Sequence, residues 1–209
     1  MSVLPASIVL ESISIEIEGK KILSEISFSL TSGRRACMMG PSGSGKSTLL
    51  KSVAGLIKPT KGFIGTIGNI GYLPQDSRDI IPPWRTVDKL ITPETARLLG
   101  LVAQMSQFPN SLSGGQLRRL AIGFVFSRSK SIYLLDEPFN GLDIDLRERC
   151  VSFISAAVKR LGSTLLFISH YEEDARSLEV NHMLRLTDNK LSDEYKFSVA
   201  SRAEATNNA

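Results

Sequence analysis

A glycine-rich segment carries the most evident chemistry. Residues 40–48 read Gly-Pro-Ser-Gly-Ser-Gly-Lys-Ser-Thr and fit G-x-x-x-x-G-K-[ST], with Gly40, Gly45, Lys46 and Ser47 at the fixed positions. Glycines let a backbone wrap closely around an anion, and a helix N-terminus adds partial positive charge. We expect Lys46 to reach the β- and γ-phosphates of a nucleotide and the Ser47 hydroxyl to ligate Mg²⁺. The predicted nucleoside triphosphate site consists of Gly40, Pro41, Ser42, Gly43, Ser44, Gly45, Lys46, Ser47 and Thr48.

The flanking segments supply the elements that must position this loop. Residues 35–39 read as a short buried strand, and residues 46–54 read as a helix. The alternative interpretation is a glycine-rich turn with a chance lysine. Because a phosphate-binding loop joins a strand to a helix, the order found here favours the nucleotide site.

Two carboxylates follow another apolar segment. Residues 132–138 read Ile-Tyr-Leu-Leu-Asp-Glu-Pro, which predicts a buried strand that ends at Asp136 and Glu137. The carboxyl ends of parallel strands face the ligand in this class of fold. Asp136 is therefore expected to hold Mg²⁺, and Glu137 to polarise the water that attacks the γ-phosphate. A pair of solvated carboxylates is the alternative, which the upstream loop disfavours.

A second glycine-rich helix start lies further along the chain. Residues 112–116 read Leu-Ser-Gly-Gly-Gln (the pentad), and helical spacing follows them. A serine and two glycines at a helix start make another anion site from backbone N–H groups. One nucleotide has no use for two such sites in one chain. The pattern therefore suggests that the pentad serves a nucleotide held by another copy.

Alternating and apolar segments indicate an α/β fold. Alternation over residues 7–17, with a break expected near Glu11, and over residues 22–30 predicts an N-terminal antiparallel β lobe. The rest alternates strands with helices, which predicts a mostly parallel sheet. Together with the loop at residues 40–48, this indicates an α/β fold with a P-loop NTPase core. The expected strands span 63–67, 69–74, 131–135 and 164–168, and the expected helices 93–102, 114–128, 145–161 and 171–178.

The chain reads as one domain over residues 1–209, with two segments of different character. Residues 76–128 predict a short, mostly helical insert (the insert). Its first part is rich in proline and suits neither a strand nor a helix interior, whereas helices are expected over 93–102 and 114–128. Residues 195–209 are polar and predict a frayed tail.

Composition limits the partners and the cellular location that we expect for this protein. The chain has 209 residues, 42% of them hydrophobic, and a net charge of +4 without a block of lysine and arginine, so we expect no nucleic-acid partner. The apolar runs are too short to span a bilayer, and residues 1–5 lack the features of a signal peptide. A cytoplasmic protein is expected. Cys37 and Cys150 read as buried thiols.

These motifs, in this order, resemble the ATP-binding cassette family, specifically the nucleotide-binding domain of ABC transporters. The pentad is diagnostic of that family, whereas many NTPases share the phosphate loop. The segments that carry the resemblance are 40–48, Gln75, 112–116, 133–137, 141–143 and His170.

The resemblance implies roles for these residues. Gln75 would contact Mg²⁺ or the attacking water, and His170 would contact the γ-phosphate. The implied catalytic set is Glu137, His170, Lys46 and Gln75, and the implied Mg²⁺ set is Ser47, Gln75 and Asp136. Ser113, Gly114, Gly115 and Gln116 would bind ATP held by the other copy, and residues 140–143 would cross the dimer interface.

The resemblance also implies partners. It predicts a head-to-tail dimer that hydrolyses ATP and docks on integral membrane permease subunits at the inner face of the membrane, with an external substrate-binding protein as a further possible partner. Residues 83–87 resemble importers of the nitrate, sulfonate and taurine type. The alternatives are a soluble ABC ATPase that acts as a mechanical switch and a degenerate binding module that does not hydrolyse ATP.

Three positions depart from the family pattern or stay open. Ile17 stands where an aromatic ring usually stacks on adenine, which predicts modest ATP affinity and weak adenine preference. Phe124 stands where an arginine is common. Trp84 is either a docking residue or part of the core of the insert.

Overall fold

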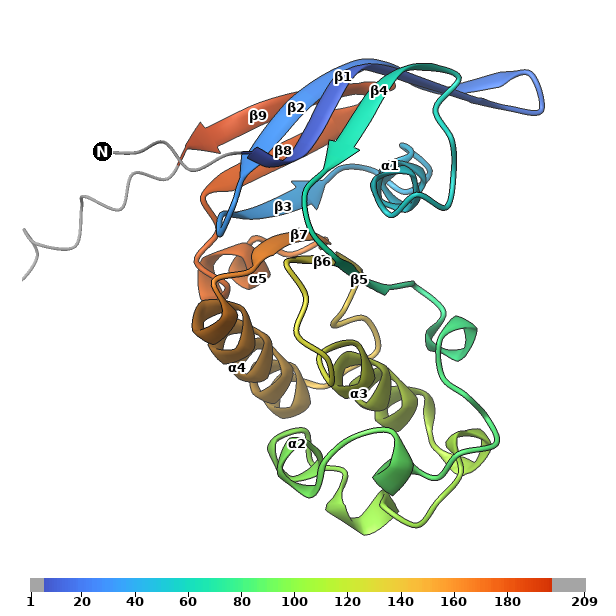
Figure 1. Cartoon of the computed structure of the whole chain (residues 1–209), viewed down its shortest axis with the longest axis vertical. Helices are drawn as coiled ribbons and strands as arrows, with labels where there is room; N and C mark the ends of the chain where they lie inside the picture. The colour runs from blue at the N-terminus through green and yellow to red at the C-terminus, as the bar shows by residue number, and fades with distance from the viewer. Residues whose placement is uncertain (1–5, 197–209) are drawn as a thin grey trace, which may run out of the picture.

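The computed structural model describes residues 6–196, which form two sheets with helices packed around them (Figure 1). The smaller sheet is antiparallel, in the order β2-β1-β4, and the larger has six strands in the order β5-β6-β7-β3-β8-β9. In the larger sheet every neighbouring pair is parallel except β8 and β9. The predicted α/β core with an antiparallel lobe is therefore confirmed.

The strand bounds follow the expected pattern, with one hairpin added. The antiparallel lobe consists of β1 (Ala6–Ile17), β2 (Lys20–Thr31) and β4 (Lys61–Thr66). The larger sheet consists of β3 (Arg35–Met39), β5 (Ile70–Leu73), β6 (Ile132–Asp136), β7 (Thr164–Ile168), β8 (His182–Thr187) and β9 (Lys190–Lys196).

The helices are α1 (Lys46–Val53), α2 (Pro93–Leu98), α3 (Gly114–Val125), α4 (Ile144–Leu161) and α5 (Glu172–Ser177). Four short 3₁₀ turns lie in the insert, at Ser77–Asp79, Val87–Lys89, Val102–Gln104 and Pro109–Ser111. No helix in the described range 6–196 is long and apolar enough to cross a membrane.

Both faces of the larger sheet are covered, because successive side chains of a strand point to opposite faces. On one face Met38, Leu134 and Ile168 pack with α1 and the antiparallel lobe. On the other face Tyr133 and Phe167 pack with α4 and with the insert, including α3. Figure 1 shows α1 between the two sheets and α3 and α4 beyond the larger sheet. The central strands β3, β6 and β7 are thereby fixed on both sides.

Several predicted bounds are corrected. β1 is continuous where a break was expected, because a bulge at Ser12, with a φ of 48°, absorbs the irregularity between Leu10 and Ile13. α2 ends at Leu98, well before residue 102, since the chain turns at Gly100 with a φ of 64°. The aspartate that caps α4 is Asp143, which lies outside the helix expected over 145–161.

The hairpin of β8 and β9 was not predicted. Asp188 and Asn189 connect its strands with φ angles of 49° and 62°, the backbone that favours a two-residue hairpin turn. β9 extends to Lys196, so the first two residues of the predicted frayed tail belong to a strand. The rest of that tail and the N-terminal segment 1–5 lie outside the described residues.

Three side chains with open interpretations are placed. Trp84 is 75% exposed and therefore does not belong to the core of the insert. Cys37 and Cys150 are buried and free, as expected, and burial raises the pKa of the Cys150 thiol to about 12. Because burial raises the pKa of each thiol, both cysteines stay protonated at neutral pH and are poor nucleophiles.

Candidate nucleotide-binding and hydrolysis site

The loop between β3 and α1 has a backbone that only glycine fits at two positions. Gly40 and Gly45 have φ angles of 148° and 98°. A Cβ on Gly40 would lie 2.2 Å from the Leu186 carbonyl oxygen, and one on Gly45 would lie 2.9 Å from a Leu23 methyl. The loop is therefore pressed against its own chain from two sides, which fixes the shape of the predicted phosphate cradle.

Lys46 is held inside this loop. Its Nζ donates hydrogen bonds to the carbonyl oxygens of Gly40 and Pro41, at 2.9 and 2.8 Å. The side chain is buried, and this burial lowers its pKa, while Glu137 and Asp136 act in the opposite direction. The ammonium thus lies against the loop with only neutral acceptors, an arrangement that favours binding of an anion.

Asp136 ends β6 beside the start of α1. Its Oδ1 accepts a hydrogen bond from Ser47 Oγ at 3.1 Å, whereas its buried Oδ2 has no partner. Burial raises the pKa of this carboxyl, against the hydrogen bond from Ser47. Ser44 Oγ in the loop is also buried without a partner.

These orphaned oxygens fit Mg²⁺. A divalent cation would satisfy Asp136 Oδ2 and would offset the cost of burying a carboxylate. The hydroxyl of Ser47 and the carboxylate of Asp136 are the oxygen donors here. Such a pair matches Mg²⁺, which typically takes one or two protein oxygens and completes its shell with phosphate and water.

Glu137 is the point where three other side chains meet. His170 Nε2 lies 3.0 Å from Oε1, while Asn140 Nδ2 and Gln75 Nε2 donate to Oε2 at 3.1 and 3.4 Å. The Glu137 backbone has a φ of 48°, a left-handed conformation that is uncommon outside glycine. Strain of this kind clusters at functional sites. The structure thus brings together Glu137, His170 and Gln75, as predicted.

His170 follows the end of β7, and a partly buried ion pair between Arg147 and Asp174 lies close to it in the chain. Arg147 of α4 donates to Asp174 Oδ1 at 2.8 Å, and Ser169 Oγ donates to the same carboxylate. Ser169 Oγ also accepts the Tyr171 N–H at 3.0 Å, so both neighbours of His170 are fixed. Local sequence does not reveal this support, because Arg147 and Asp174 lie 27 residues apart.

The pentad begins α3 with a complete capping box. The Gln116 N–H donates to Ser113 Oγ at 3.3 Å, and the Ser113 N–H donates to Gln116 Oε1 at 2.9 Å. A Cβ on Gly114 would meet nothing within 4 Å, and one on Gly115 would only touch Gly141 and Leu142 at 3.6 Å. The chain's own packing therefore requires neither glycine.

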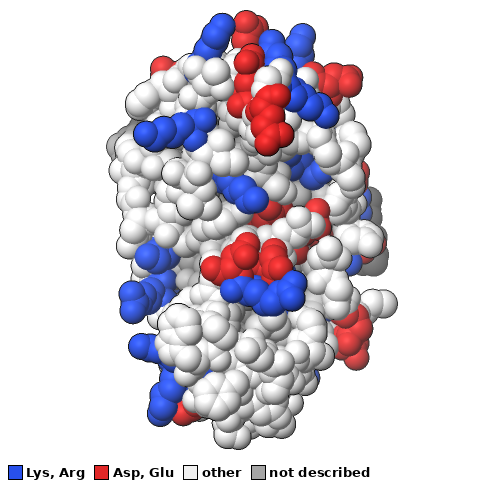
Figure 2. Space-filling model, turned by 90° about the vertical axis from the view of Figure 1, so that its right-hand side faces the viewer, with Lys and Arg blue, Asp and Glu red and all other residues white. Residues whose placement is uncertain are grey.

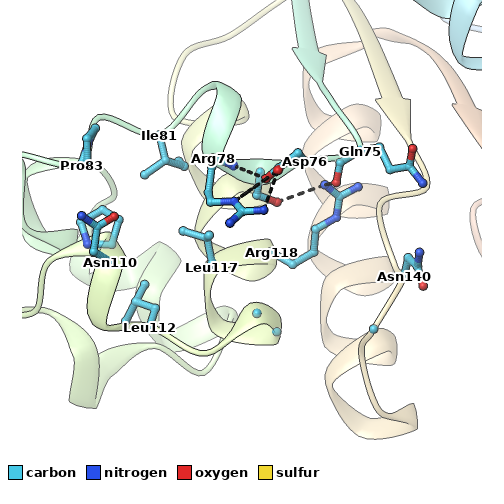
Figure 3. A pocket seen from close by; sticks show the side chains of 15 residues that line it. Gln75, Asp76, Arg78, Ile81, Pro83, Asn110, Leu112, Leu117, Arg118 and Asn140 are labelled. Atoms are coloured by element: carbon cyan, nitrogen blue, oxygen red, sulfur yellow. Dashed lines mark hydrogen bonds and ion pairs between the residues drawn. The ribbon is translucent and has the colours of Figure 1, made fainter.

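A pocket of about 830 Å³ lies beside the pentad. Gln75 and residues 76–83 line one side, while Gly114, Gly115 and Asn140 line others. Figure 3 shows Arg118 of α3 extending between Gln75 and Asn140. The pentad thus opens toward the residues that surround Glu137.

The pentad and the phosphate loop are not brought together within one chain. α1, which begins at Lys46, lies beside the antiparallel lobe, whereas α3 lies at the far side of the larger sheet (Figure 1). Of the predicted ATP-binding residues, those at 40–48 form one cradle, and Ser113, Gly114, Gly115 and Gln116 form another.

A profile of the ABC transporter family matches residues 23–140, more than half of the chain. The chain belongs to the ABC transporter family. The match includes the phosphate loop, Gln75, the pentad, Asp136 and Glu137. The chain is accordingly an ATP-binding ATPase of this family, and the match favours a transporter subunit over a mechanical switch.

Named relatives agree with this assignment. The aliphatic sulfonates import ATP-binding protein SsuB of Delftia acidovorans is 33% identical over 94% of this chain and 86% of that protein. The molybdate/tungstate import ATP-binding protein WtpC of Thermococcus kodakarensis is 30% identical over 75% of this chain and 55% of that protein. The importer-like resemblance expected from the sequence is therefore confirmed.

A solved structure supports the fold. A dimeric ATP-binding cassette in a post-hydrolysis state, bound to ADP and Pi, aligns with a TM-score of 0.81 at 22% identity. The alignment covers 91% of this chain and 99% of that one. At this identity the likeness establishes a shared cassette architecture.

Proposed function

We propose that two copies of this chain bind two ATP molecules between them, head to tail, and hydrolyse them to drive import through separate membrane subunits. Each site would combine the phosphate loop of one copy with the pentad of the other. The observation that carries the proposal is the convergence of His170, Asn140 and Gln75 on the Glu137 carboxylate. The open pentad supports the dimeric arrangement.

In the proposed reaction, the backbone N–H groups of the loop and Lys46 bind the phosphates. Ser47 and Asp136, with Gln75, would hold Mg²⁺, which supplies neutralising charge when bound. Glu137 accepts a proton from water as the water oxygen attacks the γ-phosphorus, and the bond to the β–γ bridging oxygen breaks. His170 keeps the carboxylate oriented and contacts the γ-phosphate.

Ser113, Gly114 and Gly115 of the second copy complete the site. Backbone N–H groups at the start of α3 would meet the γ-phosphate, and closure would exclude bulk water. After hydrolysis this contact is weakened and the dimer opens. The cycle converts ATP turnover into an opening and closing movement.

The insert is the proposed docking surface for the permease. Four large apolar side chains there are at least half exposed, namely Trp84, Leu98, Val102 and Phe108. In Figure 2 the middle of the lower part of the molecule, where much of the insert lies, is largely free of charged side chains. Exposed apolar surface of this kind indicates a protein partner.

The setting of the complex follows from this docking. The chain would lie in the cytoplasm on the inner face of the membrane, with an external substrate-binding protein delivering cargo to the permease. Relatives named as importers support the direction of transport. Their cargoes range from sulfonates to molybdate, so they do not define the cargo here. Co-purification of the full chain with a multi-span membrane protein tests this docking.

The decisive experiment on hydrolysis is Glu137→Gln in the full chain. We expect turnover to fall by about 100-fold or more, because the general base is lost. ATP affinity should be kept, and sizing chromatography with MgATP should show a persistent dimer. Exposed Glu148 on α4 offers the matched control, Glu148→Gln, with unchanged kinetics. Near-normal turnover of Glu137→Gln would refute the proposed role.

A further inference from the structure

Two buried arginines stand side by side on α3. Arg118 and Arg119 are only 5% and 6% exposed, and neither forms an ion pair within the described residues 6–196. Burial lowers the pKa of Arg118 to about 10, so its guanidinium stays charged at neutral pH. A buried charge without a counter-ion is costly and depends on its hydrogen-bond acceptors. The acceptors of the two arginines are what distinguishes them.

Arg118 joins the two segments that carry catalytic side chains. Its NH1 donates to the carbonyl oxygens of Pro74 and Gln75, at 2.7 and 3.2 Å, and to Ser77 Oγ at 3.1 Å. Its NH2 donates to the carbonyl oxygens of Asp136 and of Glu137, the latter at 2.8 Å.

The same guanidinium reaches one residue further. Its Nε donates to the Pro138 carbonyl oxygen at 3.1 Å, so one guanidinium binds the carbonyls of the last residue of β6 and of the two residues that follow it. Figure 3 shows this side chain between the Gln75 segment and Asn140.

Arg119 has the same chemistry but a different target. Its NH1 donates to the carbonyl oxygens of Leu99 and Gly100 in the insert, at 2.6 and 2.8 Å. Its Nε makes a longer contact of 3.3 Å with the Gly115 carbonyl oxygen, one turn earlier in the helix. Arg119 therefore ties α3 to the end of α2, away from Glu137. The neighbouring pair provides an internal control for the loss of a buried arginine.

The contacts of Arg118 bear on the geometry of Glu137. Glu137 has a left-handed backbone with a φ of 48°, a strained conformation that persists only where its surroundings enforce it. Arg118 donates to the carbonyl oxygen of Glu137 and to those of the residues before and after it. It also donates to the carbonyl oxygen of Gln75, whose side chain contacts the Glu137 carboxylate. The Arg118 side chain thus sets the position of Gln75 relative to Glu137.

We propose that Arg118 is a positioning residue of the ATPase, which fixes Glu137 and Gln75 in the geometry needed for attack on the γ-phosphate. It acts through the backbone carbonyls that it binds, and not as a group that takes part in the reaction. The role rests on the proposed function of Glu137. It assigns a kinetic effect to a residue that lies outside every motif used to identify the site.

The test compares Arg118→Lys with Arg119→Lys in the full chain. Lysine keeps the charge and the stem but cannot donate from a planar fork to two segments at once. We expect kcat of Arg118→Lys to fall about 10–100-fold with KM within about threefold, because a misplacement of about 1 Å can cost that much in rate. Arg119→Lys should lower the thermal midpoint comparably and leave kcat, per folded molecule, within about threefold.

Each outcome bears on the proposal. The proposal is wrong if Arg118→Lys and Arg119→Lys have the same kcat. It is also wrong if the fall in kcat/KM of Arg118→Lys comes entirely from a higher KM. Arg118→Gln keeps a planar amide donor, so its kcat should lie between those of Arg118→Lys and the parent. If Arg118→Lys and Arg118→Gln both fail to fold while Arg119→Lys folds, Arg118 serves the fold and the proposal is wrong. Retained turnover in Glu137→Gln would instead refute the proposed function itself.

Discussion

The molecule contains two glycine-rich helix starts that look alike in sequence and differ in how the chain uses them. At α1, a Cβ on Gly40 or Gly45 would collide with the chain itself. At α3, a Cβ on Gly114 would meet nothing, and one on Gly115 would make ordinary contacts. The first pair of glycines is required by the fold, and the second pair leaves space that the chain does not fill.

The caps of the two helices differ in the same sense. α1 begins after Gly45 in a left-handed conformation, without any side-chain cap. α3 begins with the reciprocal capping box of Ser113 and Gln116, which already satisfies two backbone N–H groups. The first helix start has no side chain that satisfies its N–H groups, whereas the second is capped by its own side chains and has open space beside Gly114. Under the proposed function, the first helix start holds the phosphates of its own nucleotide and the second completes the site of another copy.

The largest effect expected from this comparison is that of Gly40→Ala. The new Cβ would overlap the Leu186 carbonyl, and its backbone would stay strained, so we expect about 3–5 kcal/mol of destabilisation. Urea unfolding of the free chain measures it. A variant as stable as the parent would show that the loop is looser than its contacts indicate.

The double substitution Gly114→Ala and Gly115→Ala should act in the opposite way. Stability should stay the same or rise, since alanine favours a helix by about 0.8–1 kcal/mol per site over glycine. Turnover should nevertheless fall about 100-fold, because the methyl groups would fill space meant for the γ-phosphate of the partner. ATP affinity of the isolated chain is the control and should not change. Full turnover in this variant would contradict the proposed trans site.

Asp136→Asn separates ligand binding from stability in the first cradle. Because burial raises the folded-state pKa of this carboxyl, its ionised form costs stability at neutral pH. That cost is absent below the unfolded pKa of about 3.9 and grows as pH rises through the folded value. The variant should therefore melt at a higher temperature than the parent at pH 7, with a smaller difference near pH 4, while MgATP turnover is lost. A lower midpoint at pH 7 would show that the carboxylate stabilises the empty fold, and Asp145→Asn at an exposed site is the control.

The smallest effect concerns Ile17, which is 41% exposed at the end of β1. Ile17→Tyr would add a ring for adenine, and stacking contributes about 1–3 kcal/mol per base. Taking the lower value for an exposed site, we expect the Kd for ATP to fall about fivefold. Calorimetry with ATP and GTP measures both affinity and selectivity, with Ile17→Leu as control. Unchanged affinity together with strong discrimination against GTP in the parent would argue for another adenine contact.

Much of the catalytic centre was predictable because it lies in short motifs. Local sequence places Lys46 at the start of α1 and Asp136 at the end of β6, and it places Glu137 and His170 just after strands β6 and β7. Arg118 was not predictable, because its acceptors come from residues up to 44 positions away and are mostly backbone atoms. A backbone acceptor leaves no mark in residue type.

Part of the fold escaped prediction for a similar physical reason. The bulge at Ser12 keeps β1 continuous because both neighbouring strands pair with it, and local alternation does not report that pairing. The turn at Asp188 and Asn189 did offer a local signal for the missed hairpin. Sequence left Trp84 open between a docking residue and the core of the insert, because composition does not report exposure, and the structure leaves it exposed.

The open glycines of the pentad imply that complete active sites form only when two copies associate. If half of every site belongs to another molecule, the fraction of complete sites depends on how concentrated the chain is. A dilute chain would bind ATP and turn it over slowly, and specific activity would rise with protein concentration. Two copies held on one membrane partner would experience an effective concentration of about a millimolar, whatever the number of chains in the cell. The partner would then set the rate of hydrolysis by keeping two copies close together.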